Sequence, residues 1–229
     1  MPRRDPIPIL FDLDGTLVDT VPFILESVRS AFEGYGVCPT DAEWIAGIGT
    51  PLRTQLASFA QRPADVETLF ERYRTFWIAH HDERTHPFPG ALEVVAALAA
   101  AGHPIGVVTA KIEHGALRTL RHTGLLPYVQ AVVGADSCAN AKPHPEPVLL
   151  ALSRLGAAAG EALLVGDSPH DVAAGKAAGT RAVAALWGAC ARPVLAAAGA
   201  DFFLDDVRAL PALVGSLDAR REGPRGAPA

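Results

Sequence analysis

The sequence predicts an α/β fold in which a doubly wound parallel sheet carries an inserted all-helical segment. From residue 91 onward, helical patterns alternate with short apolar runs, and strands that alternate with helices form parallel sheets covered on both faces. Residues 18–86 have helical character and contain no convincing strand. With 229 residues, 49% of them hydrophobic, the chain is long and apolar enough for one large domain with an insertion.

The expected elements follow the chain in order, with apolar runs taken as strands and glycine or proline taken as breaks. A strand over 7–11 precedes a helix over 21–35, and helices over 41–83 are interrupted at 47, 49–51 and 62–63. After a break at 87–90, helices are expected over 91–101, 112–123, 145–155, 169–178, 192–198 and 207–213. Strands are expected over 104–109, 129–133, 162–166, 182–185 and 202–204.

These expectations divide the chain into three parts. Residues 1–17 and 87–219 form the α/β core, residues 18–86 form the helical insert, and the Gly-, Pro- and Arg-rich segment 220–229 is expected to be disordered. A doubly wound fold binds ligands at the carboxyl ends of its strands. Because the insert leaves from that end of the first strand, it is expected to lie over the site as a lid.

Composition restricts the possible partners. The net charge of -5 argues against a general nucleic-acid binder, which needs a basic surface. No apolar stretch approaches the length of a membrane span. The three cysteines lack a CxxC pattern and indicate free thiols in a reducing compartment. We therefore expect a cytoplasmic protein that acts on a small molecule, without a nucleic-acid or membrane partner, as a monomer or homodimer.

Two carboxylates end the first apolar run. In an extended strand, residues i and i+2 point the same way, so Asp12 and Asp14 are expected to lie side by side. Closely spaced acids repel unless a cation lies between them or one holds a proton. The pair indicates either a metal site or a nucleophile beside a general acid. An ordinary Asp-Gly turn would explain Asp14 but not a second acid within an apolar run.

Polar residues also follow two later strands. Thr109 and the backbone N–H of Ala110 are placed to bind a phosphate oxygen where the next helix begins, although Thr109 is also a plausible N-cap. Lys142 lies in a loop with prolines at 143, 145 and 147, which restrict the backbone around it. A rigidly held ammonium suits a phosphate counter-charge. The alternative is a rigid exposed linker.

The run 163–171 predicts a strand, a Gly-Asp turn and a helix start. Ser168 suits the N-cap, which places Asp171 at the third helical position. An acid there completes a capping box, so Asp171 has a purely structural explanation. Capping does not explain Asp167, which precedes the cap residue.

Residues 11–20, FDLDGTLVDT, closely resemble the first motif of the haloacid dehalogenase superfamily of phosphohydrolases, in its phosphoglycolate phosphatase-like branch. Thr109 matches the second motif of that superfamily, Lys142 the third, and Asp167 and Asp171 the fourth. The matched motifs span nearly the whole core. The resemblance implies a Rossmann-like core with a helical cap domain. It also implies that Lys142 steadies the nucleophile and the phosphoryl group, and that Asp167 is a metal ligand.

The expected chemistry is magnesium-dependent phosphoryl transfer. Because Mg²⁺ prefers oxygen ligands, it is expected to be held by Asp12, Asp167 and the backbone carbonyl of Asp14, with Asp171 acting through a water or by orienting Asp167. Asp12 is expected to attack phosphorus and form an aspartyl-phosphate, as the resemblance also implies. Asp14 is expected to protonate the leaving group and then to activate water. Thr109 and Lys142 are expected to stabilise the transferring group.

The substrate is expected to be a small phosphorylated metabolite of the 2-phosphoglycolate type. The string at residues 45–52 resembles that of phosphoglycolate phosphatases and related pyrophosphatases. Arg53 is a candidate cation for a carboxylated substrate. Lys111, which recurs in the phosphoglycolate-like branch, is a candidate for substrate contact, with a solvated lysine at a helix start as the alternative. A pyrophosphatase and a β-phosphoglucomutase-like phosphosugar mutase are the alternatives. A non-catalytic receiver-like phospho-acceptor is disfavoured, because it would need neither Asp14 nor a lid.

Overall fold

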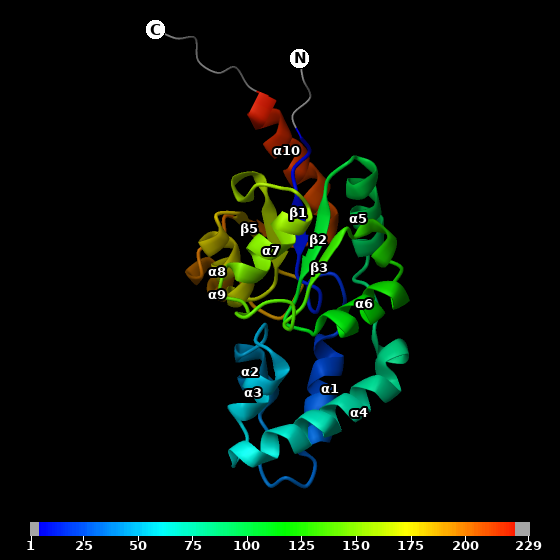
Figure 1. Cartoon of the computed structure of the whole chain (residues 1–229), viewed down its shortest axis with the longest axis vertical. Coiled ribbons are helices and arrows are strands. Elements are labelled where there is room, and N and C mark those ends of the chain that lie inside the picture. The colour runs from blue at the N-terminus through cyan, green and yellow to red at the C-terminus, as the bar shows by residue number, and fades with distance from the viewer. Residues whose placement is uncertain (1–4, 223–229) are drawn as a thin grey trace.

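The computed structural model describes residues 5–222 as an α/β core with a helical cap at one end (Figure 1). The core sheet contains parallel strands in the order β3-β2-β1-β4-β5-β6. They are β1 (Ile9–Phe11), β2 (Ile105–Val108), β3 (Ala131–Val133), β4 (Leu163–Gly166), β5 (Arg181–Ala185) and β6 (Phe202–Leu204). The α/β class and the parallel, helix-covered sheet that the sequence predicts are confirmed.

The helices fall into a cap group and a core group. The cap group is α1 (Val21–Phe32), α2 (Asp41–Ala46), α3 (Leu52–Ala57), η1 (Pro63–Asp65) and α4 (Val66–Arg84). The core group is α5 (Ala91–Ala100), α6 (Glu113–His122), η2 (Leu126–Tyr128), α7 (Glu146–Arg154), η3 (Ala159–Glu161), α8 (Pro169–Ala178), α9 (Arg192–Ala197), η4 (Val207–Ala209) and α10 (Leu210–Glu222). Within the described residues, no helix has the length and apolar composition of a membrane span.

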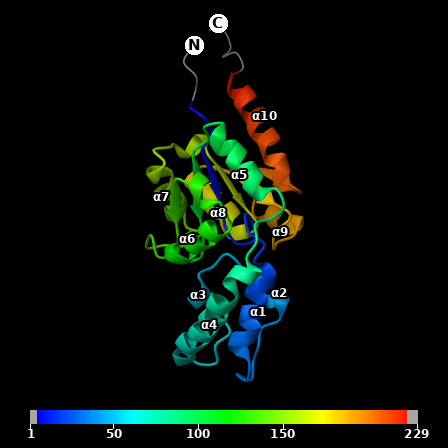
Figure 2. The same ribbon diagram turned by 90° about the vertical axis from the view of Figure 1, so that its right-hand side faces the viewer.

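Alternation along the central strand builds the two faces of the core. Ile9 and Phe11 pack with apolar residues of α5, α6 and α10. Leu10, which points the other way, packs with residues of α7 and α8. Figure 2 shows α7 and α10 on opposite sides of the sheet. The strands are short and continuously apolar because both faces are covered.

The strand register aligns the carboxyl ends of the central strands. Phe11 of β1 lies opposite Val107 of β2 and Val165 of β4. The backbone N–H of Asp12 donates to the Val165 carbonyl at 2.9 Å, so the pairing continues to the edge of the sheet. The residues that follow these strands therefore emerge together, on the side that faces the cap (Figure 1).

The cap has an apolar core of its own. This core contains Trp44 and Leu56, both essentially without exposure, and helices α1 and α4 pack closely against each other. Two linkers join the cap to the sheet, and they lie side by side: Val18 bridges to Pro87, and the Asp19 N–H donates to the His86 carbonyl at 2.9 Å.

The C-terminal helix is longer than expected. The sequence predicts a helix that ends at residue 213, whereas α10 continues to Glu222. Leu210, Val214 and Leu217 recur at helical spacing and pack against the core, and this burial outweighs the helix-breaking tendency of Gly215. Residues 220–222 of the expected disordered tail thus belong to α10, and 223–229 lie outside the described residues.

Truncating the cap core should destabilise the protein strongly. We expect Trp44→Ala to lower the free energy of unfolding by about 3–5 kcal/mol, because it removes a fully buried indole. Urea denaturation followed by circular dichroism measures this change. The control Val37→Ala, at a residue that is 45% exposed, should stay within about 0.5 kcal/mol of the parent. A loss below about 1 kcal/mol for Trp44→Ala would show that these residues are not tightly packed.

Candidate active site

A group of buried polar side chains lies at the carboxyl edge of the sheet. Asp12 follows β1, Thr109 follows β2 and Asp167 follows β4, while Lys142 comes from the loop after β3 and Asp171 from the first turn of α8. Each of these residues is at most 5% exposed. The structure therefore brings together the residues expected after β1, β2, β3 and β4, although they are far apart in the sequence.

Lys142 holds two of the acids. Its Nζ lies 3.0 Å from Asp12 Oδ1 and 2.5 Å from Asp171 Oδ1, and it also donates to the Val108 carbonyl at 3.0 Å. Burial alone would lower the pKa of Lys142, but the charges of Asp12 and Asp171 outweigh it and raise the pKa. The ammonium therefore stays charged and fixed between the two carboxylates. Among the described residues, no hydrogen bond occupies the second oxygen of Asp12, Oδ2.

Asp171 has both the structural and the site-related contacts that the sequence suggests. Its Oδ2 accepts hydrogen bonds from the Ser168 N–H and hydroxyl, which completes the predicted capping box of α8. Its Oδ1 contacts Lys142. Because its Oδ1 is ion-paired with the Lys142 ammonium and its Oδ2 accepts two hydrogen bonds from Ser168, Asp171 is better suited to orient Lys142 than to bind a metal directly.

Both carboxylate oxygens of Asp167 accept hydrogen bonds, but a negative charge is unfavourable at its buried position. Its Oδ1 accepts from the Thr16 hydroxyl at 3.1 Å, and its Oδ2 accepts from the Ala189 N–H at 2.7 Å. Burial, reinforced by the charge of Asp171, raises the pKa of Asp167 to about 7. Burial also raises the pKa of Asp12 well above its usual range, and repulsion from Asp171 and Asp167 adds to this despite Lys142. These two carboxyls resist ionisation unless a cation accompanies them.

The donor set fits a divalent metal ion. Oxygen atoms of Asp12, Asp167 and Asp171 lie within 4.8 Å of one another. With Asp14, these acids supply four carboxyl groups, and the ammonium groups in contact with them are those of Lys111 and Lys142. A fully ionised cluster thus carries an excess of two negative charges, which a divalent cation with oxygen ligands would neutralise. Asp12 and Asp167 have oxygen lone pairs available for this role.

Asp14 lies outside the group formed by the other three carboxylates. Its Oδ1 accepts from the Thr20 hydroxyl at 2.7 Å and from Lys111 Nζ at 2.9 Å. The side-by-side arrangement expected for residues 12 and 14 requires an extended strand, but β1 ends at Phe11 and the chain turns at Gly15, whose φ is 85°. A Cβ at Gly15 would lie 2.2 Å from Asp167 Oδ2, so this turn needs glycine.

Thr109 is buried at the end of β2, but it does not cap a helix. Its Oγ1 accepts from the Lys111 N–H at 3.2 Å, and the N-cap of α6 is Ile112. The N-cap alternative for Thr109 therefore does not apply. Ala110 is partly buried beside it in the same turn.

Arg53 points within the cap rather than toward the buried acids. Its guanidinium pairs with Glu67 at 2.8 Å and lies 3.5 Å from the centre of the Phe70 ring. The structure therefore does not bring Arg53 together with the strand-end residues. The cap instead reaches the core through the turn at Gly49, where an added Cβ would lie 2.7 Å from Ser168 Oγ and 3.3 Å from His170 Cδ2.

Sequence reasoning missed several residues that support the site. Thr16 and Thr20 fix Asp167 and Asp14, and both lie within the FDLDGTLVDT string, which was the available signal. Trp187 also binds this turn, because its Nε1–H donates to the Thr16 carbonyl at 2.9 Å. No pattern in the sequence indicates that role for Trp187.

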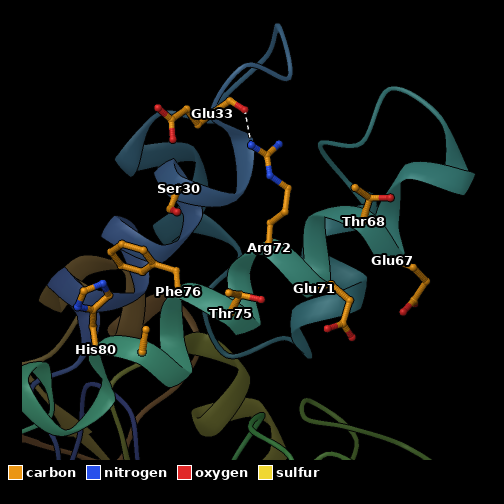
Figure 3. A pocket seen from close by; sticks show the side chains of 10 residues that line it. Ser30, Glu33, Glu67, Thr68, Glu71, Arg72, Thr75, Phe76 and His80 are labelled. Carbon is orange, nitrogen blue, oxygen red and sulfur yellow. Dashed lines mark hydrogen bonds between the residues drawn. The ribbon is translucent and has the colours of Figure 1, made fainter.

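A large surface groove lies elsewhere, on the cap between α1 and α4, with a volume of about 810 Å³. Figure 3 shows Phe76, Glu71 and Arg72 along it, and Arg72 Nη2 donates to the Glu33 carbonyl at 2.6 Å. None of the strand-end residues lines this groove. The buried acids and this groove are therefore in different places.

Comparisons with known proteins agree with this geometry. A model of the haloacid dehalogenase-like hydrolase family matches residues 9–185. The chain is 38% identical over 208 residues to the pyrophosphatase PpaX of Anoxybacillus flavithermus, which covers 90% of this chain and 96% of the relative. It is 36% identical to PpaX of Bacillus pumilus, over 91% of this chain and 96% of that one.

Solved structures show the same fold. A haloacid dehalogenase-like hydrolase of Bacteroides fragilis aligns with a TM-score of 0.83 and 26% identity, over 90% of this chain and 100% of the other. A predicted phosphoglycolate phosphatase of Haemophilus somnus aligns with a TM-score of 0.82 and 23% identity, over 91% and 97% of the two chains. The second likeness concerns the fold alone.

The buried acids should make the metal-free protein less stable as the pH rises. The folded pKa of Asp167, about 7, exceeds the value of about 3.9 for an unfolded aspartate. Its contribution to stability is complete below about pH 4 and is lost as the pH rises through about 7. Asp12 acts in the same direction. In EDTA, the melting temperature of the parent should fall between about pH 4 and 7 relative to that of Asp167→Asn.

Differential scanning fluorimetry across this pH range measures the effect. Added Mg²⁺ should raise the melting temperature of the parent more at about pH 8 than at about pH 5, because protons compete with the ion for the carboxylates. Asp205→Asn, at a surface residue, is the control and should follow the parent. Parallel curves for the parent and Asp167→Asn would contradict the raised pKa.

Proposed function

The chain belongs to the haloacid dehalogenase-like hydrolase family, and from this we propose that it hydrolyses a small phosphorylated substrate through a phosphoryl group carried on Asp12. The observation that carries the proposal is the buried contact of Asp12 with Lys142 at the carboxyl edge of the sheet. A carboxylate so placed is fixed in position, partly neutralised and shielded from bulk water.

The first step transfers the phosphoryl group to the enzyme. An oxygen of Asp12 attacks phosphorus, the new P–O bond forms as the bond to the leaving oxygen breaks, and Asp14 gives its proton to that oxygen. Lys142 and the Thr109 hydroxyl are placed to stabilise charge on the transferring group. The backbone N–H of Ala110 is a further candidate donor.

The second step restores the enzyme. Asp14, now ionised, takes a proton from a water molecule, and the water oxygen attacks the phosphorus of the acyl phosphate. The bond from phosphorus to Asp12 breaks, so inorganic phosphate leaves and both aspartates return to their starting states. Lys142 remains paired with Asp171 throughout and prevents the site from gaining uncompensated charge.

A magnesium ion is the proposed cofactor. Asp12, Asp167 and the Asp14 carbonyl would hold it, and when bound it would offset repulsion between the carboxylates and an anionic substrate. Asp171 would act on this site by fixing Lys142 rather than as a direct ligand. The fit rests on the raised pKa values of Asp12 and Asp167 and on the excess of carboxylates.

The helical insert is proposed to select the leaving group and exclude water. We assign residues 18–86 to this cap and residues 5–17 and 87–222 to the catalytic core. The turn around Gly49 supports this role, because it packs directly against Ser168 at the start of α8. Ile48 of the same turn is buried among core residues such as Val172.

Inorganic pyrophosphate is the first substrate candidate. Relatives named as pyrophosphatases reach 38% identity over nine tenths of both chains. A monoester of the 2-phosphoglycolate type is the second, favoured by the motif string at 45–52 and by the ammonium of Lys111 beside Asp14, which suits an anionic leaving group. Both candidates present a phosphoryl group joined to a small anion, so they share the proposed chemistry.

Loss of the nucleophile should abolish turnover. We expect Asp12→Asn to lower kcat by roughly 10³-fold or more, because the amide cannot form the phosphoryl intermediate. Release of inorganic phosphate from pyrophosphate with Mg²⁺ measures the effect. Asp205→Asn, at a surface residue that pairs with Arg192, should retain the parent rate. Turnover by Asp12→Asn at more than about a tenth of the parent rate would overturn the proposed mechanism.

The reaction class and substrate are tested by a panel containing pyrophosphate, 2-phosphoglycolate, nucleotides and sugar phosphates. We expect free phosphate from small anionic substrates, and none when EDTA removes the metal. Hydrolysis that continues at the same rate in EDTA would contradict the magnesium proposal. Isomerisation of a sugar phosphate without phosphate release would instead identify a mutase.

A further inference from the structure

Lys111 connects the proposed general acid to the cap. Its Nζ donates to Asp14 Oδ1 at 2.9 Å, and both side chains are 15% exposed. The same ammonium lies 4.4 Å from the centre of the Trp77 ring on α4. Lys111 therefore contacts a core residue with a proposed chemical role and a cap residue at the same time.

A second contact ties Lys111 to α4 through the core helix α6. Its Nζ lies 3.3 Å from Thr119 Oγ1, and Thr119 Oγ1 lies 3.0 Å from Nε2 of His81. His81 Nδ1 in turn lies 2.7 Å from a carboxylate oxygen of Asp82. Asp14, Lys111, Thr119, His81 and Asp82 thus form one continuous chain of polar contacts, here called the acid-to-cap chain.

The direction of each hydrogen bond in the acid-to-cap chain follows from chemistry. The Asp82 carboxylate only accepts, so Nδ1 of His81 carries the proton and donates to it. Burial lowers the pKa of His81, which favours the neutral ring, and Nε2 is then an acceptor for the Thr119 hydroxyl. The hydroxyl oxygen is left to accept from Lys111. With these roles, each donor in the acid-to-cap chain faces an acceptor.

Part of the acid-to-cap chain runs from a hydroxyl to an imidazole to a carboxylate, as in a nucleophile, a base and an acid that orients the base. These groups belong to Thr119, His81 and Asp82. A catalytic role of their own is excluded by burial, because Thr119 has no exposed surface and His81 is 1% exposed. No substrate reaches the Thr119 hydroxyl. The contacts are therefore suited to holding Lys111, the member of the chain that touches Asp14.

The cap side of this junction is rigid. The Trp77 ring stacks on Phe23 of α1, with 4.2 Å between ring centres, and on Tyr73 of α4. Asp82 also accepts from Arg118 at 3.1 Å, a second link between α4 and α6. A displacement of α4 relative to α6 would therefore break the contacts of Trp77 and His81 that restrain the Lys111 ammonium.

We propose that Lys111 is a positioning residue for Asp14 and that the cap helix α4 sets its place through Trp77, His81 and Thr119. The inference rests on the proposed function, because it concerns the residue assigned there to proton transfer. It makes the position of the cap a condition for the correct placement of Asp14. It gives Lys111 this role in addition to the contact with an anionic leaving group considered above.

A double-mutant cycle tests the proposal. Thr119→Val keeps the shape of the side chain but breaks the chain, and Thr119→Ser restores the hydroxyl. With pyrophosphate or whichever panel substrate turns over fastest, we expect Thr119→Val to lower kcat roughly 5- to 10-fold with KM within about twofold, and Thr119→Ser to recover most of the loss. Lys111→Met should lower kcat roughly 10- to 100-fold. In the Lys111→Met background, Thr119→Val should have almost no further effect.

Each other outcome overturns the proposal. Additive effects of the two substitutions would show that Thr119 does not act through Lys111, and failure of Thr119→Ser to recover kcat would assign Thr119 to packing alone. His81→Phe repeats the cycle from the cap side if Thr119→Val does not fold. Lys176→Met removes an ion pair to Asp201 elsewhere on the surface and is the control with unchanged kcat. Turnover by Asp12→Asn would instead refute the proposed function, so the two failures are distinguishable.

Discussion

The burial of several acids at one edge of the sheet is the constraint on which the rest of the molecule depends. Asp12, Asp167 and Asp171 come within 4.8 Å of one another at positions with almost no exposure. Their mutual repulsion has to be offset by an ammonium, a proton or a metal ion. Lys142 supplies part of this compensation, and the hydroxyl and amide groups that hold Asp167 and Asp171 keep the remaining acids in place.

Much of this edge could be predicted from sequence, because parallel strands bring their carboxyl ends together whatever lies between them in the chain. The alternation of apolar runs and helices was sufficient to place Asp12, Thr109 and Asp167 after three strands, and all three lie at the same edge. The capping box at Ser168 and Asp171 was also readable, since it depends on a local four-residue spacing.

The parts that could not be predicted depend on tertiary contacts. Asp14 pairs with Lys111 outside the group formed by Asp12, Asp167 and Asp171, and no pattern in the sequence shows where a strand of three residues stops. Arg53 pairs within the cap because Glu67, fourteen residues later, folds back beside it. The length of α10 depends on packing against the core, which outweighs the helix-breaking tendency of Gly215.

The closeness of the two cap linkers affects how the protein can evolve. Because Val18 lies beside Pro87, the inserted segment begins and ends at almost the same point of the core. A module attached in this way can be replaced as a unit, with the hydrophobic interior of the sheet and its acidic edge left intact. One ancestral scaffold can therefore exchange this single contiguous block, provided that the new helices keep the contacts of α4 with Lys111 and Thr119.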